Sequence, residues 1–477
     1  MSYPRPLKRA FLVVPPTGFY VREGRCQAHL KGFNAFMMRP PIELAQSAGV
    51  LLRAGVEVRL RDCPMEGLGW KDFERETAEF KPDLLLISTT VPSFRDDIEA
   101  ATVARRHCPD VVTATEGTAV PWVDMKTLQT CPALDLVIRR EPELVVEDLA
   151  AGKPLAEILG ITYRDPAAKD GYATTPERPW ITDLDDLPRP ARHLIQNHLY
   201  VRVDTGRPQT ALLMGRGCPY PCTFCLAHPA AGTQARQRKP AAIVEEILEC
   251  RERFGIEDFY MKSDLFTMYS TWVEEFCALV EERAPGIHWV CNSRADTLTP
   301  ELARRMKRAG CWGIAFGLES GTEETLRRIR KGISTADSER AIGICRAEGI
   351  MSYAYFMIGF PWEDRAAIEQ TIDFAVKLSS NLVDFFYVYP FPGTPLFDEY
   401  RKAGLLADEI PRFPQSEPAC GTLHLSVAEL KELKSRAMRR FWLRPSQIWS
   451  NLKHVKSPSV VWNYARMFAR SLVMPTA

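Results

Sequence analysis

The segment Gly215-Arg216-Gly217-Cys218-Pro219-Tyr220-Pro221-Cys222-Thr223-Phe224-Cys225 places three cysteines at the spacing C-x3-C-x2-C. Three thiolates on one tight loop can ligate three irons of a [4Fe-4S] cluster. Such clusters usually take four cysteines, so three cysteines leave one iron open to a small molecule. Cys218, Cys222 and Cys225 are therefore predicted to hold a cluster whose open iron binds and reduces a ligand.

A zinc site is the main alternative for these cysteines. Structural zinc normally takes four ligands, and the nearest further candidate is His228, three residues after Cys225. The surrounding sequence favours the cluster, because the aromatic Phe224 precedes the third cysteine and residues 210–214 predict a buried strand before the loop. The cluster would then lie at the carboxyl end of a strand, where barrel folds keep their chemistry.

Length and composition indicate a soluble protein of two or three domains. The chain has 477 residues, of which 46% are hydrophobic and 25% charged. No apolar run reaches the ~18 residues that span a bilayer, and the short apolar run after the basic N-terminus predicts a first strand rather than a signal peptide. The 13 cysteines are odd in number and show no disulfide framework. We therefore expect a cytoplasmic protein with reduced thiols.

The positive charge is concentrated at the end of the chain. Residues 431–477 hold ten lysines and arginines and one glutamate, a net charge of +9, against −8 for the remainder. This asymmetry predicts a basic region with a partner of its own. Trp442, Trp449 and Trp462 lie among the basic residues, which suits a helix in peripheral contact with an anionic membrane. A helix that packs on the barrel with solvated cations is the alternative, and no nucleic-acid-binding module is recognisable.

The order of predicted elements indicates an α/β fold. Residues 1–150 alternate strands and helices, which predicts a Rossmann-like, doubly wound domain with a parallel sheet. Residues 151–209 are expected to form a linker with a hairpin around Asp170-Gly171. Residues 210–395 contain six further β/α units, which predict a partial (β/α)6 barrel. Residues 396–477 show no strand pattern and predict a basic, helical C-terminal region.

The cysteine loop resembles that of the radical S-adenosylmethionine (SAM) superfamily, and the later strand ends extend the resemblance. The segment Phe316-Gly317-Leu318-Glu319-Ser320-Gly321 is similar to the one with which the family reaches the ribose of SAM. The resemblance implies that Gly317, Glu319 and Ser320 bind this cofactor, together with Phe224. Ser320 could instead cap a helix.

Other strand ends imply further SAM contacts. Ser263 and Asp264 occupy the family's position for the SAM amino group, although the usual Gly-Gly-Glu is absent and Asp264 could equally cap a helix. Arg294 could face the SAM carboxylate, because arginine suits bidentate contact, or form a solvated ion pair. Ile358 and Gly359 resemble the strand and turn that contact adenine.

The N-terminal half resembles the cobalamin-binding domain that is fused to many radical SAM enzymes. Pro15-Pro16, Ser88-Thr89-Thr90 and neighbouring segments carry this resemblance. It implies that Ser88, Thr89, Glu116 and Gly117 bind the nucleotide tail of cobalamin. The family often has Gly-Gly where this chain has Glu116-Gly117, and no Asp-x-His-x-x-Gly is present to supply a histidine ligand for cobalt. A degenerate domain that only packs on the barrel is the alternative.

The resemblance implies an enzyme that cleaves SAM at its cluster to a 5′-deoxyadenosyl radical, with an electron from flavodoxin or ferredoxin. With cobalamin it would methylate an unactivated carbon of a secondary-metabolite or lipid-like small molecule. A non-methylating relative, which catalyses cyclisation, ring contraction, dehydration or oxidation, remains an alternative. A non-catalytic scaffold or electron carrier is disfavoured by the Glu319 and Gly359 segments. A methylthiotransferase is disfavoured because no second cysteine cluster is evident.

Overall fold

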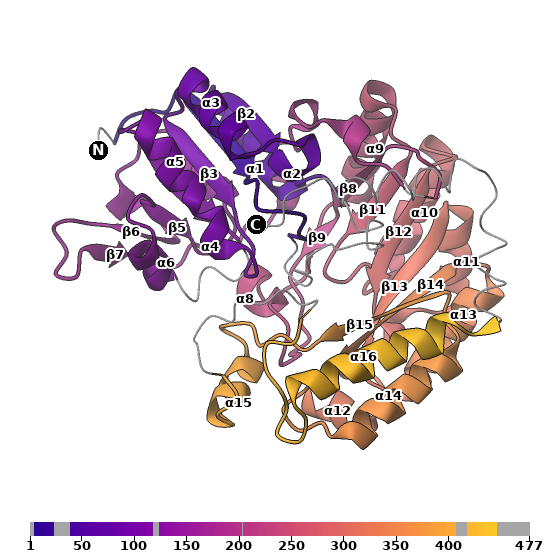
Figure 1. Cartoon of the computed structure of the whole chain (residues 1–477). Helices are drawn as coiled ribbons and strands as arrows, with labels where there is room; N and C mark the ends of the chain where they lie inside the picture. The colour runs from indigo at the N-terminus through magenta and orange to yellow at the C-terminus, as the bar shows by residue number, and fades with distance from the viewer. Residues whose placement is uncertain (1–3, 23–38, 118–123, 203, 407–416, 446–477) are drawn as a thin grey trace. The chain divides into compact units, whose positions relative to one another are not determined.

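The structure is a computed structural model, and it describes residues 4–22, 39–117, 124–202, 204–406 and 417–445. These residues form two compact units, the first ending at Tyr200 and the second beginning at Val201. Each unit is built on a mainly parallel sheet with helices packed on it (Figure 1). The expected α/β class is therefore confirmed. Residues 446–477 of the predicted basic region, with Trp449 and Trp462, lie outside the described residues.

The first unit contains a seven-stranded sheet in the order β2-β1-β3-β4-β5-β6-β7. Strands β1 to β5 are parallel, and β6 and β7 continue the sheet as an antiparallel hairpin. The strands are Arg9–Val14 (β1), Glu57–Asp62 (β2), Leu84–Ser88 (β3), Val112–Glu116 (β4), Leu136–Ile138 (β5), Ile161–Arg164 (β6) and Tyr172–Thr174 (β7). The expected linker of residues 151–209 is thus, up to Tyr200, part of the first unit, because its hairpin extends the sheet.

Helices cover both faces of this sheet, as Figure 1 shows. Alternate residues of β1 enter opposite cores: Leu12 packs with α1 and α7, whereas Phe11 packs with α3 and α5. Burial on both faces explains why the central strands β1 and β3 are nearly continuous apolar runs, whereas the edge strand β2 alternates. The helices are Ile42–Arg53 (α1), Cys63–Glu66 (α2), Trp70–Phe80 (α3), Phe94–Asp97 (α4), Glu99–His107 (α5), Asp124–Thr130 (α6) and Glu143–Ala150 (α7).

The strand order reverses direction at β1, which lies between β2 and β3. Ligands of doubly wound sheets bind beyond the carboxyl ends of the strands at such a switch point. In this unit the carboxylate of Asp97 is fully buried there and accepts hydrogen bonds from Arg22 (2.8 and 2.9 Å), Thr17 (2.6 Å) and Ser93 (2.6 Å). Arg22 also donates to the carbonyl oxygen of Ser88 at 2.8 Å. One buried ion pair therefore ties the ends of β1 and β3 together.

The second unit contains six parallel strands in the order β15-β14-β13-β12-β11-β8. Along β12, buried residues alternate with partly exposed ones, so one face packs on helices and the other lines the inside of a partial barrel. The expected partial (β/α)6 barrel is therefore confirmed. Its strands are Gln209–Leu213 (β8), Asp258–Lys262 (β11), His288–Ser293 (β12), Cys311–Glu319 (β13), Met351–Ile358 (β14) and Leu382–Tyr387 (β15), and Gly215–Arg216 (β9) pairs separately with Arg236–Gln237 (β10).

The helices of this unit follow the strands in turn, and the longer ones among them cover the outer face of the sheet (Figure 1). They are Ala227–Ala231 (α8), Pro240–Phe254 (α9), Ser270–Arg283 (α10), Pro300–Arg308 (α11), Glu323–Arg328 (α12), Thr335–Ala347 (α13), Arg365–Leu378 (α14), Pro395–Lys402 (α15) and Val427–Trp442 (α16). Helix α16 packs against α14 and β15, so it covers the last strand of the barrel. Within the described ranges, no helix has the length and apolarity needed to cross a membrane.

We predict that Asp97→Asn destabilises the first unit. The substitution leaves the buried guanidinium of Arg22 without its negative partner, and breaking a buried pair in this way costs about 3 kcal/mol. Thermal unfolding followed by circular dichroism should show a lower midpoint for this variant. The exposed Asp110→Asn is the matched control and should unfold like wild type. Equal midpoints for the two variants would contradict the role assigned to the ion pair.

Candidate active site

The cysteine loop follows β8 and is held by backbone contacts from several other elements. The N–H of Gly217 donates to the carboxylate of Asp264 at 2.8 Å. The N–H of Thr223 donates to the carbonyl of Ile329 at 3.0 Å, and the carbonyl of Thr223 accepts from the N–H of Leu396 at 3.0 Å. The loop is therefore fixed by the segments that follow β11, β13 and β15: Asp264 lies directly after β11, Ile329 ends α12, and Leu396 lies in α15.

Gly217 is required by the shape of this loop. Its φ is +89°, a conformation that side chains disfavour, and a Cβ at this position would collide with the carbonyl oxygen of Gln234. At Gly217 the loop therefore approaches the backbone of residues 231–234 more closely than a residue with a side chain would permit.

The three cysteines are suited to separate irons rather than to one metal ion. Cys218 is buried, and Cys222 and Cys225 are half-buried. In the part of the chain that the structure describes, no three His, Cys, Asp or Glu side chains are grouped as they would be around a single ion. A cubane cluster does not need such a group, because each thiolate ligates a different iron. Three thiols on one loop therefore fit three irons of a [4Fe-4S] cluster.

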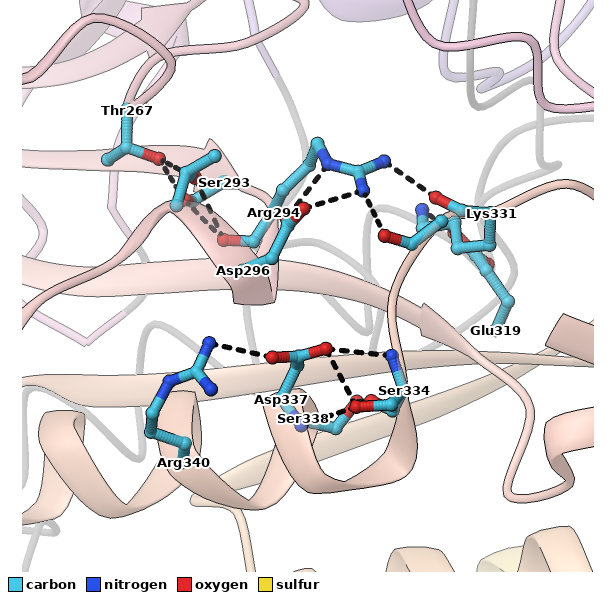
Figure 2. Close-up of polar contacts among 12 residues, drawn as sticks. Thr267, Ser293, Arg294, Asp296, Glu319, Lys331, Ser334, Asp337, Ser338 and Arg340 are labelled. Atoms are coloured by element: carbon cyan, nitrogen blue, oxygen red, sulfur yellow. Dashed lines mark hydrogen bonds and ion pairs between the residues drawn. The ribbon is translucent and has the colours of Figure 1, made fainter. Parts of the chain in front are cut away.

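Arg294, which follows β12, contacts both Asp296 and the segment that contains Lys331 (Figure 2). Its guanidinium carbon lies 3.6 Å from the ring centre of Tyr220 in the cysteine loop. The same group donates to Asp296 twice at 2.9 Å, to the carbonyl of Lys331 at 2.8 Å and to the carbonyl of Gly332 at 3.1 Å. Four of its five N–H donors thus bind protein acceptors, so the expected bidentate contact with a SAM carboxylate does not fit this arrangement.

Glu319 and Lys331 form a buried ion pair beside the cysteine loop. The Nζ of Lys331 lies 2.6 Å from Oε1 of Glu319, and both side chains are about nine-tenths buried. The Nζ also lies 5.8 Å from the ring centre of Phe224. Burial raises the pKa of the Cys222 thiol, and the cations of Lys331 and Arg294 oppose this shift because they favour the thiolate.

The backbone at the end of β13 is shaped around this ion pair. The register with β14 shifts between Gly317 and Glu319, a bulge of the kind found next to active sites. Glu319 itself has a φ of +65°, which is rare for a residue with a side chain. A Cβ on Gly317 would collide with the Glu319 carboxylate and would lie 3.0 Å from the Lys331 ammonium. The Gly-x-Glu segment therefore makes room for a charged pair at the strand end.

The other predicted SAM residues lie at the same edge but have protein partners. The hydroxyl of Ser320 lies 3.2 Å from those of Thr322 and Thr371, and the hydroxyl of Ser263 accepts from the N–H of Leu265 at 3.2 Å. Both are therefore fixed parts of the turns after β13 and β11. Asp264 acts on the cysteine loop rather than as the cap of a helix.

The turn after β14 is organised by a carboxyl group that the motifs did not indicate. Glu363 is completely buried and accepts from the N–H groups of Gly359 (2.8 Å) and Phe360 (3.1 Å). Burial raises the pKa of Glu363 to about 7, and these two hydrogen bonds oppose the shift. The side chain of Ile358 lies in the core, so only its backbone can reach a ligand, whereas Gly359 (φ +100°) forms the turn itself.

In the first unit, the predicted cobalamin residues lie together at the ends of β3 and β4. Ser88 is the register partner of Glu116. The hydroxyl of Thr89 donates to the Glu116 carbonyl at 2.6 Å, and a Cβ on Gly117 would collide with Thr89. The carboxylate of Glu116 is buried and accepts from Ser47 of α1 at 3.4 Å. The hydroxyl of Thr89 is therefore used in joining the two strands.

Sequence reasoning missed Lys331, Asp296, Tyr220 and Glu363. Lys331 is one of several basic residues between 327 and 331, and no local pattern distinguishes it. Glu363 could have been noticed, because a glutamate four residues after a turn glycine can accept the hydrogen bonds of that turn. The others depend on contacts between residues far apart in the sequence.

The chain is similar to known proteins in sequence and in fold. Residues 212–375 match the family described as the radical SAM superfamily. An uncharacterized methyltransferase of Pyrococcus horikoshii is 30% identical over 412 residues, which cover 85% of this chain and 88% of the relative. The anaerobic magnesium-protoporphyrin IX monomethyl ester cyclase of Rubrivivax gelatinosus is 25% identical over a region that covers 76% of this chain and 66% of the cyclase. Among solved structures, the chain shares its fold with the radical SAM methyltransferase TsrM of Kitasatospora setae, solved with cobalamin and a [4Fe-4S] cluster bound. The TM-score is 0.67 at 19% identity, and the match covers 91% of this chain and 85% of TsrM.

We predict that Gly217→Ala reduces cluster incorporation. The new Cβ meets the Gln234 carbonyl, and the left-handed conformation adds roughly 1–2 kcal/mol of strain, so the loop must shift. After anaerobic reconstitution, iron and sulfide per chain should fall at least about twofold relative to wild type, because a displaced loop holds the cluster less tightly. Gly343→Ala, in helix α13 where a Cβ meets nothing, is the control and should retain full iron content. Equal iron content in the two variants would refute the steric argument.

We predict that Glu363 makes the protein less stable as pH rises. Its pKa in the folded state, about 7, lies above the ordinary value of 4.5, so ionisation disfavours the folded state between these values. Glu363→Gln keeps the acceptor for both N–H groups without the charge. Urea unfolding should therefore give the variant a gain over wild type at pH 8, up to roughly 3 kcal/mol, that shrinks as pH falls and disappears at about pH 4, below the ordinary pKa of the carboxyl group. The exposed Glu252→Gln should show no such dependence, and a gain that is the same at both pH values would refute the assignment.

Proposed function

Because the chain belongs to the radical SAM superfamily, we propose that it is a cobalamin-dependent methyltransferase acting on an unactivated carbon of a small molecule. A bound [4Fe-4S] cluster supplies the electron that cleaves SAM, and cobalamin supplies the methyl group. The protein's own residues hold these groups, orient them and exclude water.

The observation that carries the proposal is the convergence of strand ends on the cysteine loop. Asp264 from the end of β11 binds Gly217, Arg294 from the end of β12 stacks on Tyr220, and the segment after β13 binds Thr223. A loop that needed only to bind a structural metal would not require support from three neighbouring strands. A catalytic cluster requires it, because the reacting atoms must be held in a fixed geometry.

The Glu319–Lys331 pair suits the amino-acid portion of SAM, which carries both an ammonium and a carboxylate. Lys331 is the better candidate for the carboxylate, since the donors of Arg294 are nearly all used. Glu319 is the candidate for a hydrogen-bonded or cationic group of the same ligand. The turn at Gly359, held by Glu363, offers backbone groups for adenine.

Cobalamin fits the first unit in its topology. The strand order places a switch point at β1 and β3, where such sheets bind nucleotide-like ligands. Ser88, Thr89 and Gly117 lie at that edge. Because the Thr89 hydroxyl already donates to the Glu116 carbonyl, we propose that these residues contact cobalamin through their backbone groups and through the shape of their turns. The sequence provides no Asp-x-His-x-x-Gly histidine as a ligand for cobalt.

Non-methylating radical chemistry is the second candidate. The specific observation in its favour is the buried carboxylate of Glu116, which occupies the edge at which the cobalamin tail would bind. A cyclase among the relatives is consistent with this alternative.

We assign the remaining partners by the chemistry of the reaction. The electron would come from flavodoxin or ferredoxin in the cytoplasm. A lipid-like substrate and peripheral membrane contact through residues 396–477 are further proposals, which a vesicle flotation assay tests.

The decisive experiment uses the full chain, reconstituted anaerobically with iron, sulfide, SAM, dithionite and hydroxocobalamin. We expect wild type to release 5′-deoxyadenosine and to retain cobalamin after desalting. Cys222→Ala should release none above background, because one cluster ligand is lost. Cys420→Ala, a half-buried cysteine outside the loop, is the matched control and should behave like wild type.

The two readouts separate the candidates. Release of 5′-deoxyadenosine without retained cobalamin would replace the methyltransferase proposal by the non-methylating one. Equal release by wild type and Cys222→Ala would refute the cluster assignment itself.

A further inference from the structure

Helix α16 has three distinct faces. Leu430, Leu433, Ala437 and Phe441 are buried in the core of the second unit. On one side of this stripe Arg436 and Arg440 face α14. On the other side lies a groove of about 510 Å³ whose lining is shared by α16, the end of β15 and Glu417, namely Tyr387, Glu417, Lys431, Lys434, Ser435, Met438 and Arg439.

The cations that face α14 are paired. Arg436 lies 2.7 Å from Glu369, and Arg440 lies 2.7 Å from Asp373. These exposed ion pairs add little to the packing of α16, which its buried stripe provides. They account for part of the positive charge that the sequence concentrates at this end of the chain.

Of the three cations that line the groove, one has an ion-pair partner among the described residues. Lys431 pairs with Glu417 at 2.6 Å. Lys434 and Arg439 have no ion-pair partner within the described residues. The lining therefore carries an excess of two positive charges.

Lys434 is only partly exposed, and its Nζ lies 4.7 Å from the ring centre of the buried Tyr387. Burial lowers the pKa of Lys434, and the carboxylates of Asp384 and Glu417 oppose this shift without forming an ion pair with it. Removing an ammonium from water without a paired anion is unfavourable. This cost, at the mouth of an open groove, indicates that a negatively charged ligand completes the site.

We propose that the groove between α16 and the end of β15 binds an organic anion, a phosphate or carboxylate joined to an apolar body. Lys434 and Arg439 bind the charged group, because cations form strong charge-assisted hydrogen bonds with oxyanions. Tyr387 and Met438 contact the apolar part, since the groove is far larger than one phosphate ion. This site goes beyond the reaction proposed above, and its test needs neither turnover nor SAM.

The test measures binding of phenyl phosphate to the full, reconstituted chain by isothermal titration calorimetry at low ionic strength. Lys434→Gln/Arg439→Gln should weaken binding about tenfold or more, because both charge-assisted contacts are lost. Arg436→Gln/Arg440→Gln is the matched control: it removes the same charge from the same helix, outside the groove, and should bind like wild type. Ser435→Glu introduces a negative charge, which repels the anionic probe, at an exposed position of the groove. It should also weaken binding, without disturbing the core.

A second arm identifies the source of the anion. Sedimentation with phosphatidylglycerol vesicles, compared with phosphatidylcholine vesicles, tests a lipid headgroup. Vesicle binding that depends on Lys434 and Arg439, without affinity for phenyl phosphate, supports the site with a lipid as its ligand. The proposal is overturned if phenyl phosphate and vesicles both fail to bind, or if the groove and control variants weaken binding equally, since the latter indicates non-specific attraction by net charge.

Discussion

The candidate active site depends on the contacts that the guanidinium of Arg294 makes with two separate segments. This group stacks on Tyr220 of the cysteine loop and holds the carbonyls of Lys331 and Gly332. The first contact positions the loop that carries the thiols, and the second positions the lysine that pairs with Glu319. A lysine could not replace this arginine, because only a planar guanidinium combines a stacking face with several fixed donors.

Two energetically unfavourable features at the end of β13 become understandable from this arrangement. A glutamate in the left-handed region costs about 1 kcal/mol or more, and a buried ion pair gains little over apolar packing. Neither feature is explained by stability of the fold. Both bring a carboxylate and an ammonium to the edge that carries the cysteine loop, where a zwitterionic ligand can bind them.

The sequence predicted a strand at residues 210–214, within one residue of β8 at each end, because this segment is a nearly continuous buried apolar run. It also identified the cysteine loop and the Gly317–Glu319 segment, which are local patterns. It did not predict the contacts of Arg294, whose partners at residues 220 and 331–332 are distant in the sequence. The expected linker and the observed first unit differ for a similar reason: the sequence indicates the hairpin of β6 and β7, but nothing local shows that β6 pairs with β5.

The first unit sets a limit on how a cofactor can be recognised at its switch point. The polar side chains there are largely satisfied by one another: Asp97 holds Arg22 and Thr17, and Thr89 holds the Glu116 carbonyl. A cofactor at this edge must therefore be recognised by the shape of the turns and by backbone groups, unless it displaces one of these contacts. Displacing the Asp97 contacts would leave a buried charge unpaired, which costs several kcal/mol. The neutral hydrogen bond from Thr89 to the Glu116 carbonyl is consequently the less costly contact to displace at this edge.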